Sequence, residues 1–426
     1  MKSRQRKSKH EPLACLILAA GKGTRMYSAK NKVLHTLLGV PMAAYAVERA
    51  RDIGATTVVA VLGHQKLEVA RALKDRFGPD APTVVEQKEQ KGTGHAVRLG
   101  LRPLADFDGL VAILYGDVPL LQKETLSSLA TAARRTGSLA MLTSVVHDPT
   151  GYGRVVRDDK GRIREVVEHK DATHAQLRIA EVNAGIYAAP AAFLREATAK
   201  LSSRNAQGEL YLTDIVAKAA ATIGVVSVQV TAEEMTGVND RIQLVGAERI
   251  LLGRLIRGHM KHATFRAPKL AYVEADVTIE PDVEIGRNVV LRGKTHVGAS
   301  ARIEDGAILD NVRVGEGAHL LPYCVIRDAT IGENALIGPF AHLGPGTEVG
   351  PNVQVGSCIE GKSAPPDRDD EEVDEDVGFG DYGGYEQGQS PAKSVWWAPA
   401  GTRFPRTQTC VVIGKRPKRR PTKQRR

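Results

Sequence analysis

A six-residue repeat in the second half of the chain limits the fold more than any other feature of the sequence. Aliphatic residues recur at nearly every sixth position from residue 279 to residue 355, at Ile279, Ile285, Leu291, Val297, Ile303, Ile308, Val314, Leu320, Ile326, Ile331, Ile337, Leu343, Val349 and Val355. Hexapeptide repeats of this kind are typical of a parallel β-helix, in which each short strand places one aliphatic residue inside. With about three strands in a coil, these 14 positions predict between four and five coils.

The first half of the chain has a different pattern, in which short apolar runs alternate with segments that have the period of a helix. The runs are residues 13–20, 57–62, 110–114 and 139–146, and the helical segments include 41–53 and 65–76. This alternation predicts a mostly parallel sheet covered by helices, which is an α/β domain. Ligands bind beyond the carboxyl ends of the strands in such sheets, so the loops after these runs are where chemistry is expected.

These patterns divide the chain into five parts. We predict a basic, disordered N-terminus over 1–12, an α/β domain over 13–240, a linker helix over 241–265, a β-helix over 266–360 and a disordered tail over 361–426. The tail opens with an acidic, glycine-rich block, which repels itself and does not pack. Because the repeat stops abruptly at Gly361, one hypothesis is that the residues after it are read out of frame. Translating the other frames of the gene would test that hypothesis.

Charge and composition argue against several classes of protein. The net charge is +10, but the two ends of the chain carry more basic residues than this excess, so the part between them is slightly acidic. Aromatic residues make up only 4%, which does not suit a protein that stacks nucleic-acid bases. No apolar run approaches the ~20 residues that span a bilayer, so we expect no membrane segment. The four cysteines are Cys15, Cys324, Cys358 and Cys410. Their spacing is not typical of zinc sites or disulfide frameworks, so we expect a cytoplasmic protein.

A glycine-rich loop, residues 18–26, follows the first apolar run. Gly21 and Gly23 lack a Cβ, so backbone N–H groups in this loop can approach phosphate oxygens closely, and Arg25 adds positive charge. The loop is not a Walker A motif, and Met26 stands where a dinucleotide fingerprint has its third glycine. The glycine pair alone is equally compatible with a plain tight turn.

The wider string around this loop resembles a known family. LAAGKGTRMYS, followed by Lys32-Val33-Leu34-His35, is similar to the sugar-1-phosphate nucleotidylyltransferases. In detail it resembles the uridylyltransferase half of the bacterial bifunctional N-acetylglucosamine-1-phosphate uridyltransferase/glucosamine-1-phosphate acetyltransferases, the GlmU family. The resemblance covers about residues 13–360 and rests on several separate motifs in the same order. It implies a Rossmann-like nucleotidyltransferase domain followed by a shortened left-handed parallel β-helix.

The resemblance also implies which residues bind the nucleotide. The phosphates would be wrapped by the loop and by a downstream lysine, that is by Ala20, Gly21, Gly23, Thr24, Arg25 and Lys32, of which Arg25 and Lys32 would be catalytic. Gln87 would pair with uracil, and Gly92 and Thr93 would line the nucleotide. A side-chain amide suits uracil because the base offers both a donor and an acceptor. The family has a proline before its lysine, whereas this chain has Asn31.

Further motifs imply a metal site and a sugar site. Asp117 follows the apolar strand in Leu114-Tyr115-Gly116-Asp117, and a carboxylate at the carboxyl end of a strand is well placed to hold Mg²⁺ against phosphates. The alternative role for Asp117 is a helix N-cap. By resemblance, Asp117 and Asn239 would hold Mg²⁺, Tyr115 and Asn239 would contact substrate, and Gly153, Glu168 and Asn183 would bind the sugar.

The reaction that the resemblance implies joins UTP and N-acetylglucosamine 1-phosphate to give UDP-N-acetylglucosamine and pyrophosphate. It would depend on Mg²⁺ and supply cell-wall precursors, in a homotrimer assembled through the β-helix. The alternatives are the full bifunctional enzyme, a related sugar-1-phosphate nucleotidylyltransferase and a non-catalytic assembly subunit. Nucleic-acid binding through the basic ends is a fourth alternative, but the chain shows no recognition fold for it.

The second activity of the family is where the resemblance stops. The family's acetyltransferase residues lie in later coils, and no matching sequence follows residue 362 here. An arginine of the family's Phe-Ala-Arg-Leu-Arg-Pro-Gly string is Gly344 in this chain, and only Lys362 still matches a substrate-binding lysine. We therefore expect no acetyltransferase activity.

Overall fold

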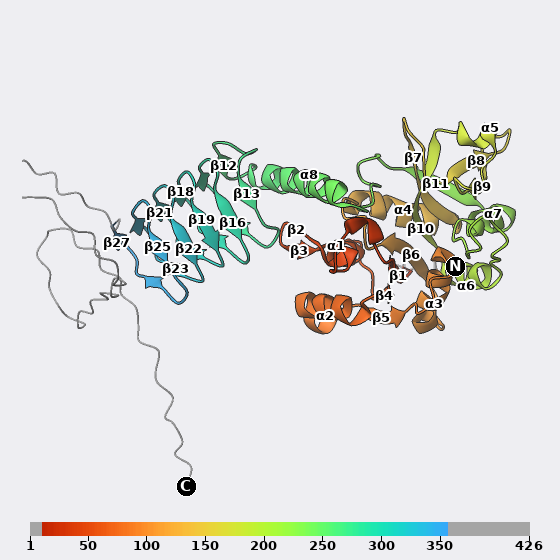
Figure 1. Ribbon diagram of the computed structural model, residues 1–426, viewed down its shortest axis with the longest axis horizontal. Helices are drawn as coiled ribbons and strands as arrows, with labels where there is room; N and C mark the ends of the chain where they lie inside the picture. The colour runs from red at the N-terminus through yellow and green to blue at the C-terminus, as the bar shows by residue number, and fades with distance from the viewer. Residues whose placement is uncertain (1–10, 357–426) are drawn as a thin grey trace, which may run out of the picture. The chain divides into compact units, whose positions relative to one another are not determined.

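The computed structural model describes residues 11–356 of the 426-residue chain (Figure 1). By its contacts the chain divides into two compact units, Met1–Leu255 and Ile256–Arg426. Several predictions concern residues outside this range: the disordered tail, almost all of the disordered N-terminus and the altered reading frame. Outside it too are Cys358, Lys362 and Cys410.

The first unit is built on a nine-stranded sheet. Its strands are β1 (Leu13–Ala19), β4 (Thr57–Leu62), β5 (Thr83–Glu86), β6 (Leu110–Tyr115), β7 (Leu139–Val145), β8 (Arg154–Arg157), β9 (Ile163–Val167), β10 (Glu181–Pro190) and β11 (Val225–Gln229). Seven of them run in the order β11-β7-β10-β6-β1-β4-β5, and the β8–β9 hairpin pairs beside β10 (Figure 1). The four apolar runs of the sequence are β1, β4, β6 and β7, so the predicted mostly parallel sheet is confirmed. Only β10 breaks the pattern in the middle of the sheet, where it is antiparallel to both β6 and β7.

Two groups of contacting helices accompany this sheet. One group is α1 (Met42–Asp52), α2 (Lys66–Phe77) and α4 (Lys123–Thr136), and the other is α3 (Thr93–Gly100), α6 (Ala191–Ala199) and α7 (Asp214–Ala221). Short elements in the loops are η1 (Thr24–Met26), η2 (Lys32–Leu34), β2 (Thr36–Leu37), β3 (Val40–Pro41), η3 (Gly78–Asp80), η4 (Arg102–Leu104) and α5 (His174–Leu177). Every residue of β1 is buried, as expected for a parallel strand that is covered on both faces.

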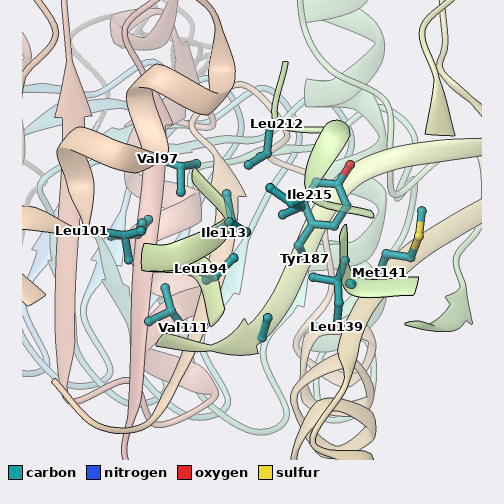
Figure 2. Packing of buried hydrophobic residues seen from close by; sticks show 14 of the residues in the cluster. Val97, Leu101, Val111, Ile113, Leu139, Met141, Tyr187, Leu194, Leu212 and Ile215 are labelled. Atoms are coloured by element: carbon teal, nitrogen blue, oxygen red, sulfur yellow. The ribbon is translucent and has the colours of Figure 1, made fainter. Parts of the chain in front are cut away.

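The hydrophobic core lies between the sheet and the second group of helices. Val111 and Ile113 of β6 pack with Val97 of α3, Leu194 of α6 and Ile215 of α7, and all five are buried (Figure 2). Because successive residues of a strand face opposite ways, the intervening residues of β6 face the first group of helices. The core therefore holds the carboxyl ends of β1 and β6 in fixed positions, and the loops that leave those ends start from rigid strands.

Cys15 and Cys324, the two cysteines that the structure describes, are both free and buried. Burial raises the pKa of the Cys15 thiol to about 12 and that of the Cys324 thiol to about 11. Both groups therefore stay neutral near pH 7, where only a thiolate would react or bind a metal.

The second unit is a parallel β-helix, as the repeat predicts. Its strands fall in turn into three parallel sheets: β12 (Thr264–Phe265), β15 (Glu284–Ile285), β18 (Arg302–Ile303), β21 (His319–Leu320), β24 (Leu336–Ile337) and β27 (Gln354–Val355); β13 (Tyr272–Val273), β16 (Val290–Arg292), β19 (Ile308–Asp310), β22 (Val325–Arg327) and β25 (His342–Leu343); β14 (Thr278–Ile279), β17 (His296–Val297), β20 (Arg313–Val314), β23 (Thr330–Ile331) and β26 (Glu348–Val349). Consecutive strands belong to different sheets, so the chain winds through one coil for every three strands.

One position of the predicted repeat is wrong. Leu309 pairs with Leu291 of the preceding coil and is fully buried, whereas Ile308 is only half-buried. The five-residue step therefore runs from Leu309 to Val314 and does not precede Ile308. Residues 307–309 are all apolar, so spacing alone could not show which of them points inward.

The boundary between helix and β-helix also differs from the prediction. The helix predicted over 241–265 is α8, which spans Arg241–His259, and the first strand of the β-helix already occupies Thr264–Phe265. The six-residue spacing extends back from Ile279 to the buried Val273, but Phe265 is also buried and does not keep that spacing, so the first strand lies before the repeat. Within residues 11–356, no helix combines the length and the apolar character that crossing a membrane requires.

Candidate active site

The glycine-rich loop after β1 is shaped around a lysine that follows it. Gly23 has a φ of +62°, and a Cβ at this position would lie 2.5 Å from the Cβ of Lys32. A side chain at residue 23 would therefore collide with the stem of Lys32 and strain the backbone as well. Two side chains anchor the ends of the loop: Gln90 Nε2 donates to the Ala20 carbonyl at 2.7 Å, and Arg241 Nε donates to the Met26 carbonyl at 3.1 Å.

Asn31 fixes the backbone before Lys32, at the position where the family has a proline. Its backbone has a φ of −55°, close to the value that a proline ring imposes. Its side-chain oxygen accepts a hydrogen bond from Val33 N at 3.1 Å, which caps the short helix η2, and its Nδ2 donates to the His64 carbonyl at 2.7 Å. The turn that positions Lys32 is therefore held by hydrogen bonds in place of a ring.

Lys32, Asp117 and Asn239 meet at the carboxyl edge of the sheet. Lys32 Nζ donates to Asp117 Oδ2 at 2.5 Å and to Asn239 Oδ1 at 3.1 Å, and Lys32 is only 8% exposed. The loops that carry the two acceptors are themselves joined, because Val238 N donates to the Asp117 carbonyl at 2.8 Å. Two oxygens from distant parts of the sequence thus converge on one positive charge.

A cavity of about 270 Å³ opens beside this cluster on the side of the loop after β5. The residues that line it are Leu18, Ala19, Ala20, Gly21, Lys32, Val33, Gln87, Gln90, Gly92, Thr93, Ala96, Tyr115, Asp117 and Glu209. Gln87 is buried, and its Nε2 lies 3.1 Å from the Gly92 carbonyl and 3.3 Å from His95 Nδ1. Its amide nitrogen is therefore engaged by the protein, and its oxygen is the atom that can accept from a ligand. His95 Nδ1 also lies 3.1 Å from the Glu89 carbonyl, which can only accept, and burial lowers the pKa of His95.

Gly92 and Thr93, which line this cavity, are held in place by a segment that is far away in the sequence. Leu210 N donates to the Lys91 carbonyl and Gly94 N donates to the Leu210 carbonyl, both at 2.8 Å. Thr93 Oγ1 accepts from Leu212 N at 3.1 Å. Gly92 has a φ of +98°, and a Cβ there would lie 2.6 Å from the Leu210 carbonyl oxygen. Residues 91–94 and 210–212 therefore act as a single hydrogen-bonded unit.

A second cavity, of about 470 Å³, adjoins the first, and both are lined by Thr93, Tyr115 and Asp117. Its other lining residues include Arg25, Thr150, Gly151, Tyr152, Gly153, Glu168, Asn183, Gly185, Tyr187, Thr213, Asn239 and Gln243. Gly153 packs tightly here, because a Cβ at this position would lie 2.8 Å from Val166 and 3.6 Å from Glu168 Oε2. Asn183 N donates to the Gly153 carbonyl at 2.9 Å, so the proposed sugar residues come together.

Burial shifts the titration of two groups in the second cavity. It raises the pKa of the Glu168 carboxyl, although Thr213 Oγ1 donates to Glu168 Oε1 at 3.0 Å and opposes the shift. It also raises the pKa of Tyr115 above its usual value, and the charges of Asp117 and Glu168 add to that effect. Tyr115 therefore keeps its proton and can donate a hydrogen bond across the boundary between the two cavities.

Most of the residues singled out from the sequence line one of these two cavities. The exceptions are Gly23, which makes room for Lys32, and Thr24, which is the exposed first residue of η1. Sequence reasoning did not assign Gln90, Glu209 or Tyr187. Gln90 and Glu209 lie in the strings at residues 87–96 and 205–209, which also resemble the family, whereas nothing in the sequence marks Tyr187.

The donor set at the cluster suits a hard divalent cation. Among residues 11–356 no group of three or more histidine, cysteine, aspartate and glutamate side chains is arranged to hold a metal. The pair of Asp117 and Asn239 already converges on the ammonium group of Lys32, which is a stand-in for a cation at that point. A site with one carboxylate and one amide leaves most of the coordination to phosphate and water, as Mg²⁺ sites commonly do.

Comparison with known proteins agrees with both halves of the fold. Residues 15–199 match the MobA-like NTP transferase domain, and residues 328–358 match the bacterial transferase hexapeptide repeat. The chain is 46% identical to the bifunctional protein GlmU of Sorangium cellulosum, over 76% of this chain and 69% of the relative. It is 45% identical to the GlmU protein of Anaeromyxobacter dehalogenans strain 2CP-C, over 76% of this chain and 67% of the relative. It is 41% identical to that of Acinetobacter baylyi, over 75% of this chain and 69% of the relative.

Proposed function

The chain belongs to the GlmU family, and from that premise we propose that it transfers uridylyl from UTP to N-acetylglucosamine 1-phosphate. The products are UDP-N-acetylglucosamine, a precursor for the cell wall, and pyrophosphate. The observation that carries this proposal is the pair of adjoining cavities that meet at Asp117. The first cavity takes the nucleotide, with Gln87 against uracil. The second takes the sugar phosphate, with Gly153, Glu168 and Asn183 around the sugar.

The proposed reaction requires neutralisation of negative charge and does not require a general base. The attacking oxygen belongs to the phosphate of the sugar substrate and is already an anion, so no proton has to be removed. The obstacle is the approach of two anions, and enzymes overcome it by positioning and by fixed positive charge. Lys32, which lines the first cavity, and Arg25, which lines the second, would supply that charge on the two sides of the reacting phosphates.

A divalent cation completes this arrangement, and we propose that it is Mg²⁺ held by Asp117 Oδ2 and Asn239 Oδ1. When bound, Mg²⁺ supplies Lewis-acid neutralisation of charge on the phosphates. Asp117 contributes a formal negative charge, and Asn239 contributes an oriented carbonyl dipole. Gln243 fixes the second ligand, because its Oε1 accepts from Asn239 N at 2.7 Å.

The raised pKa of Glu168 predicts a pH dependence of sugar binding. The carboxylate accepts hydrogen bonds from sugar hydroxyls, and burial favours its protonated form. As the pH falls toward the raised pKa, the acceptor is lost, so the KM for the sugar phosphate rises at a higher pH than an exposed glutamate would allow. Initial rates at several pH values measure this, and Glu168→Gln should remove the dependence while raising KM throughout. The phosphate of the sugar substrate titrates at pH ~6 in assays of the wild type and of the variant alike. Its contribution therefore cancels when the two pH profiles are compared. A wild-type profile identical to that of the variant would contradict the role of Glu168.

The β-helix and the protein's setting are proposed from the family as well. We propose that the chain assembles as a homotrimer through its hexapeptide coils and works in the cytoplasm. Acetyl transfer is still not expected, because Gly344 stands where the family string has an arginine. A Cβ at Gly344 would meet nothing within 4 Å, so packing does not explain the loss of that side chain.

A pyrophosphate-release assay tests the proposed function directly. The purified chain is given UTP with N-acetylglucosamine 1-phosphate, glucose 1-phosphate or galactose 1-phosphate, each with Mg²⁺ and with a chelator. We expect the N-acetylated sugar phosphate to be used best and the chelator to abolish turnover. A better rate with glucose 1-phosphate would favour the related nucleotidylyltransferase, and no release with any sugar phosphate would favour the assembly subunit.

A further inference from the structure

We propose that Tyr187 is a positioning residue of the sugar site, because its buried hydroxyl fixes the orientation of the Asn183 amide. This inference deepens the proposed function and rests on it, since Asn183 is the residue assigned to the sugar. Asn183 Nδ2 donates to Tyr187 Oη at 2.6 Å, and both residues line the second cavity. Asn183 is 8% exposed and Tyr187 is 1% exposed, so water does not compete for this bond.

An irregularity in β10 makes the contact. Asn183 pairs with Thr143 of β7 and Tyr187 pairs with Met141, so four steps along β10 match only two along β7. In a regular strand, side chains four residues apart would stand about 13 Å from each other along the strand. The bulge at residues 184–186 shortens that distance until the two side chains touch.

A backbone contact at Gly185 shows which end of the Asn183 amide carries the oxygen. Gly185 N donates to Asn183 Oδ1 at 3.1 Å, and a backbone N–H can only donate, so the oxygen of the amide must face it. The nitrogen then faces Tyr187. Gly185 itself has a φ of +78°, and a Cβ there would lie 3.0 Å from the ring of Tyr115, which also lines both cavities. The bulge of β10, the Asn183 amide and the ring of Tyr115 therefore pack against one another.

The position of Tyr187 in the core makes this restraint rigid. Its ring lies among the aliphatic side chains of the core, and its hydroxyl oxygen is directed away from Val111 and Leu139 (Figure 2). Burial raises the pKa of this hydroxyl well above its usual value, so it stays neutral at any working pH. With one N–H and one lone pair committed, Asn183 offers one N–H and one lone pair to the ligand in a set direction.

Tyr187→Phe tests the proposal by removing only the hydroxyl. We expect the KM for the sugar phosphate to rise about fivefold to tenfold, the effect of one buried hydrogen bond, with the KM for UTP unchanged. By calorimetry, the variant should bind UDP-N-acetylglucosamine more weakly by the same factor and bind UDP as the wild type does. Tyr45→Phe is the matched control, because Tyr45 is a buried tyrosine whose Oη donates to the Leu37 carbonyl at 2.7 Å, outside both cavities. It should leave both KM values unchanged.

A double-variant cycle separates positioning from a general structural effect. In an Asn183→Ala background, Tyr187→Phe should change the sugar KM by less than about twofold, since the amide it orients is gone. An equal effect in both backgrounds would overturn the proposal. So would a crystal structure of Tyr187→Phe with the Asn183 amide unmoved, whatever the substrate proves to be. If wild-type protein binds UDP-N-acetylglucosamine no better than UDP, the proposed function fails, and that crystal structure still decides the positioning role.

Discussion

Asp117→Asn is expected to lower kcat by about 10²-fold or more, the scale of losing one electrostatic stabiliser at a reacting phosphate. The change keeps the size of the side chain and removes the single carboxylate of the cluster. It also leaves the ammonium of Lys32, which is 8% exposed, without its charged partner. We therefore expect unfolding to become easier by about 1–3 kcal/mol, because the ammonium group loses a charge-assisted hydrogen bond and keeps at most a neutral amide acceptor. Steady-state rates and thermal unfolding measure the two effects separately.

Two further variants keep the loss of activity from being confused with loss of structure. Asp117→Asn combined with Lys32→Met removes both charges, so stability should return while turnover does not. Asp108→Asn is the matched control, since Asp108 is an exposed aspartate just before the opposite end of the same strand, β6. It should behave as the wild type. Wild-type turnover in Asp117→Asn at saturating Mg²⁺ would refute the metal assignment.

Lys32→Met is expected to change catalysis and cation binding in opposite directions. We expect kcat to fall by about 10²-fold, because a fixed positive charge at the leaving pyrophosphate is lost. In the absence of nucleotide we expect Mn²⁺ to bind about tenfold more tightly. Lys32 Nζ occupies both Asp117 Oδ2 and Asn239 Oδ1, at 2.5 and 3.1 Å, and the variant frees these oxygens and removes a repelling charge. The signal of free Mn²⁺ in electron paramagnetic resonance gives the affinity without any turnover.

Lys218→Met supplies the control for this measurement. Lys218 is also a lysine of the first unit whose Nζ is held by the protein, donating to the Ala197 carbonyl at 2.8 Å, but it lines neither cavity. Its loss should change neither kcat nor the affinity for Mn²⁺. If Lys32→Met bound Mn²⁺ no more tightly than the wild type, Lys32 would not be competing for the metal ligands.

The β-helix could be predicted from the sequence because its signal repeats. One inward aliphatic residue per strand recurs often enough that a single ambiguous position, Ile308 against Leu309, does not hide the period. Only the first strand, Thr264–Phe265, fell outside the predicted β-helix, because the step from Phe265 to Val273 is longer than six residues. Repetition therefore reveals the architecture, while individual registers depend on packing that one sequence does not show.

The residues of the candidate site could be predicted where they belong to sequence motifs that directly follow a strand. Those motifs place Asp117 and Gln87 at the edge where ligands of α/β sheets bind, although the roles of the residues stay predictions. Tyr187 could not be found in this way. Only the bulge of β10 brings Tyr187 to Asn183, and a bulge depends on how β10 pairs with β7, which local sequence does not encode.

The fit between Gly23 and Lys32 bears on how this enzyme can evolve. A methyl group at residue 23 would meet the lysine stem before it met any nucleotide, because the two positions are 2.5 Å apart at Cβ. Selection for a cation at the phosphates therefore also acts on Gly23, because its lack of a side chain leaves room for the stem of Lys32. A substitution of Gly23 alone would displace Lys32. We therefore expect related sequences to keep both residues or to change both.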